Sequence, residues 1–122
     1  MISILDTNVI FSYLVKNDTN HKKAVEIINK YDKIIMTTVT ILELTYILKK
    51  SNIDLSIIKD LLYSEEVEFV DNSIEDIIFS INNKPKSYDE FNDYIILHTA
   101  LRLNTNLETF DEELLKEYKK HK

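Results

Sequence analysis

Short apolar runs alternate with helical segments along the chain, and this order restricts the possible folds more than any other feature. Four runs are too short for helices and predict buried strands: Ile2–Leu5, Lys33–Thr37, Val67–Val70 and Asn106–Thr109. Seven further segments predict helices: Val9–Val15, His21–Tyr31, Thr38–Lys50, Leu55–Tyr63, Ser73–Ile81, Tyr88–Leu103 and Asp111–Lys120. Strands that alternate with helices predict a parallel sheet with both faces covered. We therefore expect an open α/β sandwich, in which ligands bind beyond the carboxyl ends of the strands.

The size and composition of the chain suit one globular domain. Its 122 residues are 44% hydrophobic and 30% charged, with no repeat or linker. No apolar run reaches the roughly 20 residues that cross a bilayer. The first residues also lack the basic segment and cleavage site of a signal peptide. We expect a single domain over residues 1–122 that lies in the cytoplasm and not in a membrane.

Two residue types are missing, and their absence excludes several kinds of site. The chain has no cysteine, which excludes disulfides and cysteine-based zinc sites, and no glycine, which excludes Gly-rich phosphate loops. The net charge is −6 and Arg102 is the only arginine, which argues against a protein that coats nucleic acid. The negative charge does not exclude an enzyme that binds phosphate through a divalent metal, because the metal supplies the positive charge.

Three apolar stretches each contain one isolated carboxylate. These are Asp6 within residues 1–15, Glu43 within residues 34–48 and Asp93 within residues 91–101. A helix as apolar as Thr38–Leu48 is expected to be largely buried. A buried carboxylate without a partner is unfavourable, so each of these acids needs a partner or a proton.

A shared divalent cation at the edge of the core would satisfy all three acids, and carboxylate oxygens suit Mg²⁺ or Mn²⁺. Each acid also has an ordinary interpretation. Asp6 follows a strand and can cap a helix, Glu43 can pair with a distant lysine, and Asp93 can favour a helix dipole. Asp111 opens the last helix, and its position alone predicts a cap.

Local signals predict two helix ends and the place of one histidine. Ser73 and Asp76 are three residues apart and predict a capping box. The turn before the last strand is Leu103-Asn104-Thr105-Asn106, and because asparagine tolerates a left-handed conformation, this turn can form without glycine. His98 is expected to pack or form a hydrogen bond in the core.

The residues around the isolated acids resemble the motifs of PIN-domain nucleases. Four segments carry the resemblance: the opening strand and acid in Ile2–Asn8, the glutamate helix in Val39–Leu44, the aspartate helix in Asn92–Ala100, and the closing Thr-x-Asp in Thr109–Asp111. Their order and the chain length are similar to those of the small PIN toxins of VapBC-type toxin–antitoxin pairs. In many relatives arginine or lysine precedes the third acid, whereas Asn92 stands there in this chain.

The resemblance implies a three-layer α/β/α sandwich with a short parallel sheet. It implies a metal-dependent endoribonuclease that hydrolyses the phosphodiester bonds of RNA and uses Mg²⁺ or Mn²⁺. The residues carried over are the acids Asp6, Glu43, Asp93 and Asp111 and the supporting Asn8 and Thr109. VapC-type members usually form homodimers and are inhibited by a small antitoxin protein.

Two other functions stay open at this stage. One is a catalytically silent PIN-like scaffold that binds RNA or protein, although the presence of all four acids disfavours it. The other is an α/β phosphoryl-transfer module, which also places an aspartate after its first strand. A phosphatase of that kind requires Asp-x-Asp, whereas this chain has Asp6-Thr7-Asn8.

Overall fold

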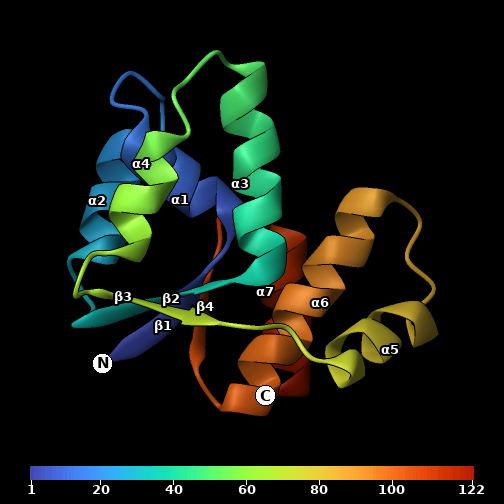
Figure 1. Cartoon of the computed structure of the whole chain (residues 1–122). Helices are drawn as coiled ribbons and strands as arrows, with labels where there is room; N and C mark the ends of the chain where they lie inside the picture. The colour runs from blue at the N-terminus through green and yellow to red at the C-terminus, as the bar shows by residue number, and fades with distance from the viewer.

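The computed structural model describes residues 1–122 and contains four strands and seven helices (Figure 1). The strands are β1 (Ile2–Leu5), β2 (Lys33–Thr37), β3 (Val67–Val70) and β4 (Asn106–Glu108). The helices are α1 (Thr7–Leu14), α2 (His21–Ile28), α3 (Thr38–Lys50), α4 (Ser56–Leu62), α5 (Ile74–Asn82), α6 (Tyr88–Leu103) and α7 (Glu112–His121). The expected alternation of strands and helices is confirmed.

The four strands form one parallel sheet in the order β3-β2-β1-β4. The chain builds from β1 outward to β3 and then returns to the other side of β1 to place β4. This reversal puts a topological switch point between β1 and β4. In open α/β sheets, ligands bind at such a point, beyond the carboxyl ends of the strands.

Helices cover both faces of the sheet, so the predicted α/β/α sandwich is confirmed. Leu5 of β1 belongs to a core with residues of α1 to α4, while its neighbour Ile4 belongs to a core with residues of α6 and α7. This division follows from the strand backbone, because successive side chains point to opposite faces. Figure 1 shows α1 to α4 on one side of the sheet and α5 to α7 on the other.

Turns that elsewhere favour glycine are made by other residues. Asn52, Lys84 and Asn104 have positive φ angles of 58°, 51° and 53°. Asn104 ends α6 in the left-handed conformation, so the turn before β4 forms without glycine as expected, and of its two asparagines the structure uses the first. The capping box of α5 is also confirmed, because Ser73 and Asp76 exchange side chain–backbone hydrogen bonds.

One expectation about burial is wrong. Helix α3 is apolar nearly all round, yet only the stripe Thr40, Leu44 and Leu48 is fully buried. Leu42 and Tyr46 on its other face are 63% and 67% exposed, because no other part of the chain packs over them. No helix of the fold combines the length and apolar character that crossing a bilayer requires.

Candidate active site

The acids singled out in the sequence gather at the carboxyl ends of β1 and β4 and at the helices that flank them. Asp6 directly follows β1, and Asp111 follows β4 after a short connection. Glu43 lies in the second turn of α3 and Asp93 in the second turn of α6. Residues far apart in the chain thus meet beside the switch point of the sheet.

Asp6 is held by two hydrogen bonds and is almost fully buried, with 4% of its surface exposed. Its Oδ1 accepts from the backbone N–H of Thr7 at 2.8 Å, so Asp6 caps α1 and the helix begins at Thr7, two residues before its predicted start. Its Oδ2 accepts from the Thr109 hydroxyl at 2.7 Å. The capping role and a role in the site are therefore compatible, since each oxygen retains a free lone pair.

Glu43 is oriented by two residues that the sequence did not indicate as part of the site. The Thr7 hydroxyl donates to Glu43 Oε1 at 2.7 Å, and Asn92 Nδ2 donates to Oε2 at 3.1 Å. Asn92 is 1% exposed. The only signal for these two residues was their position, each next to an isolated acid.

Thr109 connects Asp6 to Asn8 and to the backbone of Asp111. Its hydroxyl oxygen accepts from Asn8 Nδ2 at 3.4 Å and from the backbone N–H of Asp111 at 3.0 Å. Asn8 Oδ1 in turn accepts from the Phe110 N–H at 3.2 Å. Asp111 also caps α7 by accepting from the amides of residues 113 and 114, as its position predicts. These bonds fasten the segment after β4 to the segment after β1.

The acids are close enough to disturb one another's ionisation. Burial raises the pKa of Asp6 to about 6, and the charges of Glu43 and Asp111 add to the rise, against the lowering effect of its two hydrogen bonds. Burial also raises the pKa of Asp93 to about 8, and the charges of Asp6, Asp111, Glu43 and Asp89 add to it. Asp93 and Asp111 line one cavity of about 320 Å³ together with Asp89.

No cationic side chain neutralises this cluster. The salt bridges of the fold involve other acids: Asp32, Asp76, Glu113 and Glu117. Arg102, the only arginine, pairs with Asp76 and forms no salt bridge with an acid of the cluster. Mutual repulsion among unpaired carboxylates is therefore relieved only by protons or by a cation from solution.

The residues fit a hard divalent cation by their chemistry, since all the donors are oxygen atoms with excess negative charge. Their spacing limits the number of side chains that could ligate a metal ion, because no group of three or more acidic or histidine side chains is arranged to hold one directly. Mg²⁺ usually keeps several waters and binds through one or two carboxylates plus substrate phosphates. The cluster is suited to that mode of binding and not to an all-protein cage.

A family model described as the PIN domain matches residues 3–120, nearly the whole chain. The chain belongs to the PIN domain family. The resemblance seen in the four sequence motifs is confirmed by this match. No curated protein matches the chain by sequence.

Solved structures share this PIN fold at low sequence identity. VapC20 from Mycobacterium tuberculosis, a sarcin-ricin loop cleaving toxin, superposes with a TM-score of 0.80 at 11% identity, covering 94% of each chain. VapBC2 from Rickettsia felis, bound to a DNA fragment from its promoter, gives 0.65 at 21% identity, covering 96% of this chain and 92% of that one. A toxin–antitoxin complex from Klebsiella pneumoniae gives 0.64 at 22% identity, covering 89% and 86%.

Proposed function

We propose that this PIN domain is a metal-dependent endoribonuclease, the toxin of a VapBC-type toxin–antitoxin pair, with residues 1–122 acting as one domain in the cytoplasm. The observation that carries the proposal is the convergence of acids from four distant segments at the switch point of the sheet, without a cationic partner. The acids that would bind Mg²⁺ or Mn²⁺ are Asp6, Glu43, Asp93 and Asp111, supported by Asn8 and Thr109.

When bound, a divalent cation supplies a water of lowered pKa and neutralises charge that develops on phosphate. The protein's own contribution is orientation. Thr7 and Thr109 fix the two oxygens of Asp6, and Thr7 and Asn92 fix those of Glu43. Asp93 makes no such bond, and its raised pKa marks it as the carboxylate that gains most from a nearby positive charge. Asp111 caps α7 and, together with Asp93, lines the acidic cavity of about 320 Å³.

An RNA substrate and an antitoxin are the partners in this proposal. The structurally similar VapC20 is a sarcin-ricin loop cleaving toxin, and two further similar structures are toxin–antitoxin complexes. A second copy of the chain is the third partner. The exposed isoleucines of α5 offer apolar surface for a homodimer: Ile74, Ile77, Ile78 and Ile81. Sedimentation of the wild type and of Ile78→Lys distinguishes dimer from monomer.

The proposal is tested by incubating the purified chain with labelled single-stranded RNA in Mg²⁺, Mn²⁺ or EDTA. We expect cleavage only with metal, and its loss in Asp6→Asn with the fold retained by circular dichroism. Asp60→Asn is the matched control, since Asp60 is an exposed acid on α4 remote from the site. Wild-type cleavage by Asp6→Asn contradicts the assignment, and no cleavage by the wild type favours a silent scaffold.

A further inference from the structure

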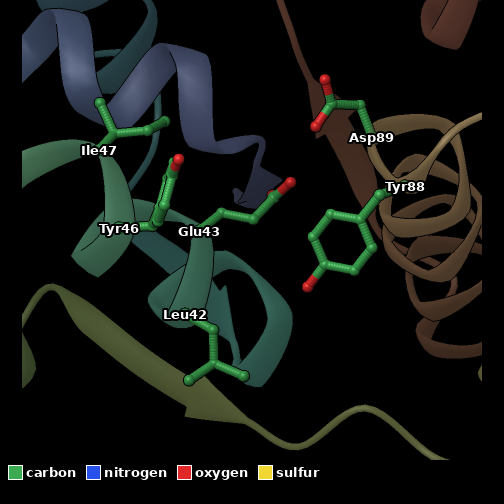
Figure 2. Close-up of a pocket in the computed structure, with 6 residues that line it drawn as sticks. All are labelled: Leu42, Glu43, Tyr46, Ile47, Tyr88 and Asp89. Carbon is green, nitrogen blue, oxygen red and sulfur yellow. The ribbon is translucent and has the colours of Figure 1, made fainter. Parts of the chain in front are cut away.

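A mainly apolar pocket of about 660 Å³ lies beside the acidic cavity, and Glu43 is the only one of its lining residues with a role in the chemistry described above. Six residues line it: Leu42, Glu43, Tyr46, Ile47, Tyr88 and Asp89. Figure 2 shows that α3 provides one wall and the start of α6 the other, with the Glu43 side chain extending between Tyr46 and Tyr88. Asp89 lines both this pocket and the acidic cavity, so the two hollows adjoin.

The two tyrosines of this pocket, which we call the tyrosine pocket, are unusually open to solvent. Tyr46 is 67% exposed and Tyr88 is 73% exposed. Neither hydroxyl forms a hydrogen bond within the chain, whereas the hydroxyls of Tyr31 and Tyr118 do. Contiguous exposed apolar surface on a domain of this kind marks a binding site more often than chance exposure does.

The charge of this protein does not by itself favour the binding of a nucleic acid. The net charge is −6, and the guanidinium of the only arginine, Arg102, is already paired with Asp76. A strand of RNA that reaches the acids needs another source of affinity. Stacking of bases on aromatic rings supplies it, because every base has a π-face and stacking tolerates any sequence.

One lysine, Lys50, lies close to the pocket without lining it. Lys50 Nζ lies 5.9 Å from the centroid of the Tyr46 ring, one turn farther along α3. An ammonium group at this position polarises the ring and can also meet a backbone phosphate. The pocket thus presents two aromatic rings beside the acid cluster, and Lys50 lies next to one of these rings but outside the pocket lining.

We infer that the tyrosine pocket binds an unpaired nucleobase of the RNA strand adjacent to the phosphate held at the acid cluster, with Tyr46 and Tyr88 as the stacking surfaces. The inference rests on the proposed ribonuclease function and names its substrate as single-stranded RNA. A base within a duplex is already stacked and paired, so it is excluded from the pocket.

Binding is tested with a dye-labelled ten-nucleotide RNA of mixed sequence, measured by anisotropy on full-length protein carrying Asp6→Asn to prevent cleavage. We expect Tyr46→Ala and Tyr88→Ala each to weaken binding by about 5- to 100-fold, the loss expected when one base loses its stacking partner. Phenylalanine at either position keeps the ring and should keep the affinity. Tyr63→Ala is the matched control, since Tyr63 is 82% exposed but lies outside the pocket.

Cleavage kinetics in the otherwise wild-type protein separate this inference from the proposed function. We expect the alanine variants to raise KM and to leave kcat within about twofold, because stacking contributes binding and not chemistry. Cleavage by the wild type, with both alanine variants binding and cleaving like Tyr63→Ala, overturns the tyrosine pocket alone and assigns the exposed rings to a protein partner. Absence of cleavage by the wild type overturns the nuclease, and the anisotropy data then decide whether the pocket binds RNA.

Discussion

Asp6 and Asp76 are both buried, with 4% and 0% of their surfaces exposed, but the fold treats them in opposite ways. Burial by itself would raise the pKa of Asp76, yet hydrogen bonds from Arg102, the Ser73 amide, His98 and Thr99 outweigh it and hold that pKa well below its usual range. The pKa of Asp6 is instead raised to about 6, since its two hydrogen bonds do not offset burial and the nearby acids.

The difference separates an acid with a structural role from the acids that we propose bind a metal ion. Around Asp76, Arg102 donates at 3.0 and 3.1 Å, His98 Nδ1 lies 2.6 Å away and the Thr99 hydroxyl donates at 2.8 Å. These bonds tie α5 to α6. The only arginine of the chain is used here, whereas none of the salt bridges involves an acid of the cluster at the carboxyl ends of β1 and β4.

Removing the counterion of Asp76 has the largest expected effect on stability. Arg102→Met leaves a buried carboxylate without its main partner, and breaking such a pair destabilises by about 3 kcal/mol. Urea unfolding monitored by circular dichroism measures the change. Lys116→Met is the matched control, because the Lys116–Glu113 pair is exposed at 3.9 Å and should change stability by less than about 0.5 kcal/mol. Equal stability of the two variants would mean that Arg102 does not stabilise the buried Asp76. The contrast between Asp76 and Asp6 would then fail.

Removing the hydroxyl that links the acid cluster has the next largest effect. Thr109→Val eliminates the bonds to Asp6, Asn8 and the Asp111 amide, and we expect a loss of about 1 to 2 kcal/mol together with slower RNA cleavage. Thr38→Val serves as the control, since it removes one exposed hydrogen bond to Asp71. A Thr109→Val protein with wild-type stability and wild-type cleavage would mean that Thr109 does not support Asp6.

The pH dependence of stability should differ in sign between the two regions. Asp76 has a lowered pKa, so its contribution is present above about pH 4 and is lost as the pH falls below that value. Asp93 has a raised pKa of about 8, so its contribution is present below about pH 4 and is lost as the pH rises toward 8.

Substituting Asp93 isolates the second of these contributions. Asp93→Asn should therefore be more stable than the wild type at pH 8 by about 1 kcal/mol, a modest value because solvent screens a half-buried group. The difference should vanish near pH 4. Urea midpoints of the wild type and Asp93→Asn from pH 4 to 8, without divalent metal, measure this difference in stability. Parallel curves for the two proteins would refute the repulsion between Asp93 and the nearby acids.

Local signals made much of this fold predictable. The alternation of strands and helices, the capping box of α5 and the left-handed Asn104 each depend on residues close together in the sequence. The four acids could also be identified, because a lone charge in an apolar stretch is visible without knowledge of the fold. The rule that ligands bind beyond the carboxyl ends of parallel strands pointed to Asp6, which follows β1, but it could not place Asp93, whose helix α6 follows another helix.

Contacts between distant segments could not be predicted in the same way. Arg102 pairs with Asp76 across 26 positions, and Asn92 donates to Glu43 across 49, with no periodicity to indicate either contact. The exposure of Leu42 and Tyr46 was also missed. An apolar helix predicts burial, but the sequence does not state whether the covering surface belongs to the same chain or to a ligand.

Thermal unfolding at pH 8, with and without Mn²⁺ at constant ionic strength, tests the central claim most directly. A ligand that binds only the folded chain raises its stability, and saturating Mn²⁺ should raise the Tm of the wild type by about 5 °C. Asp93→Asn should start at a higher Tm than the wild type in EDTA and gain little from the metal. A wild-type Tm that does not respond to Mn²⁺, or an equal rise in Asp93→Asn, would contradict an acid cluster built to receive a cation.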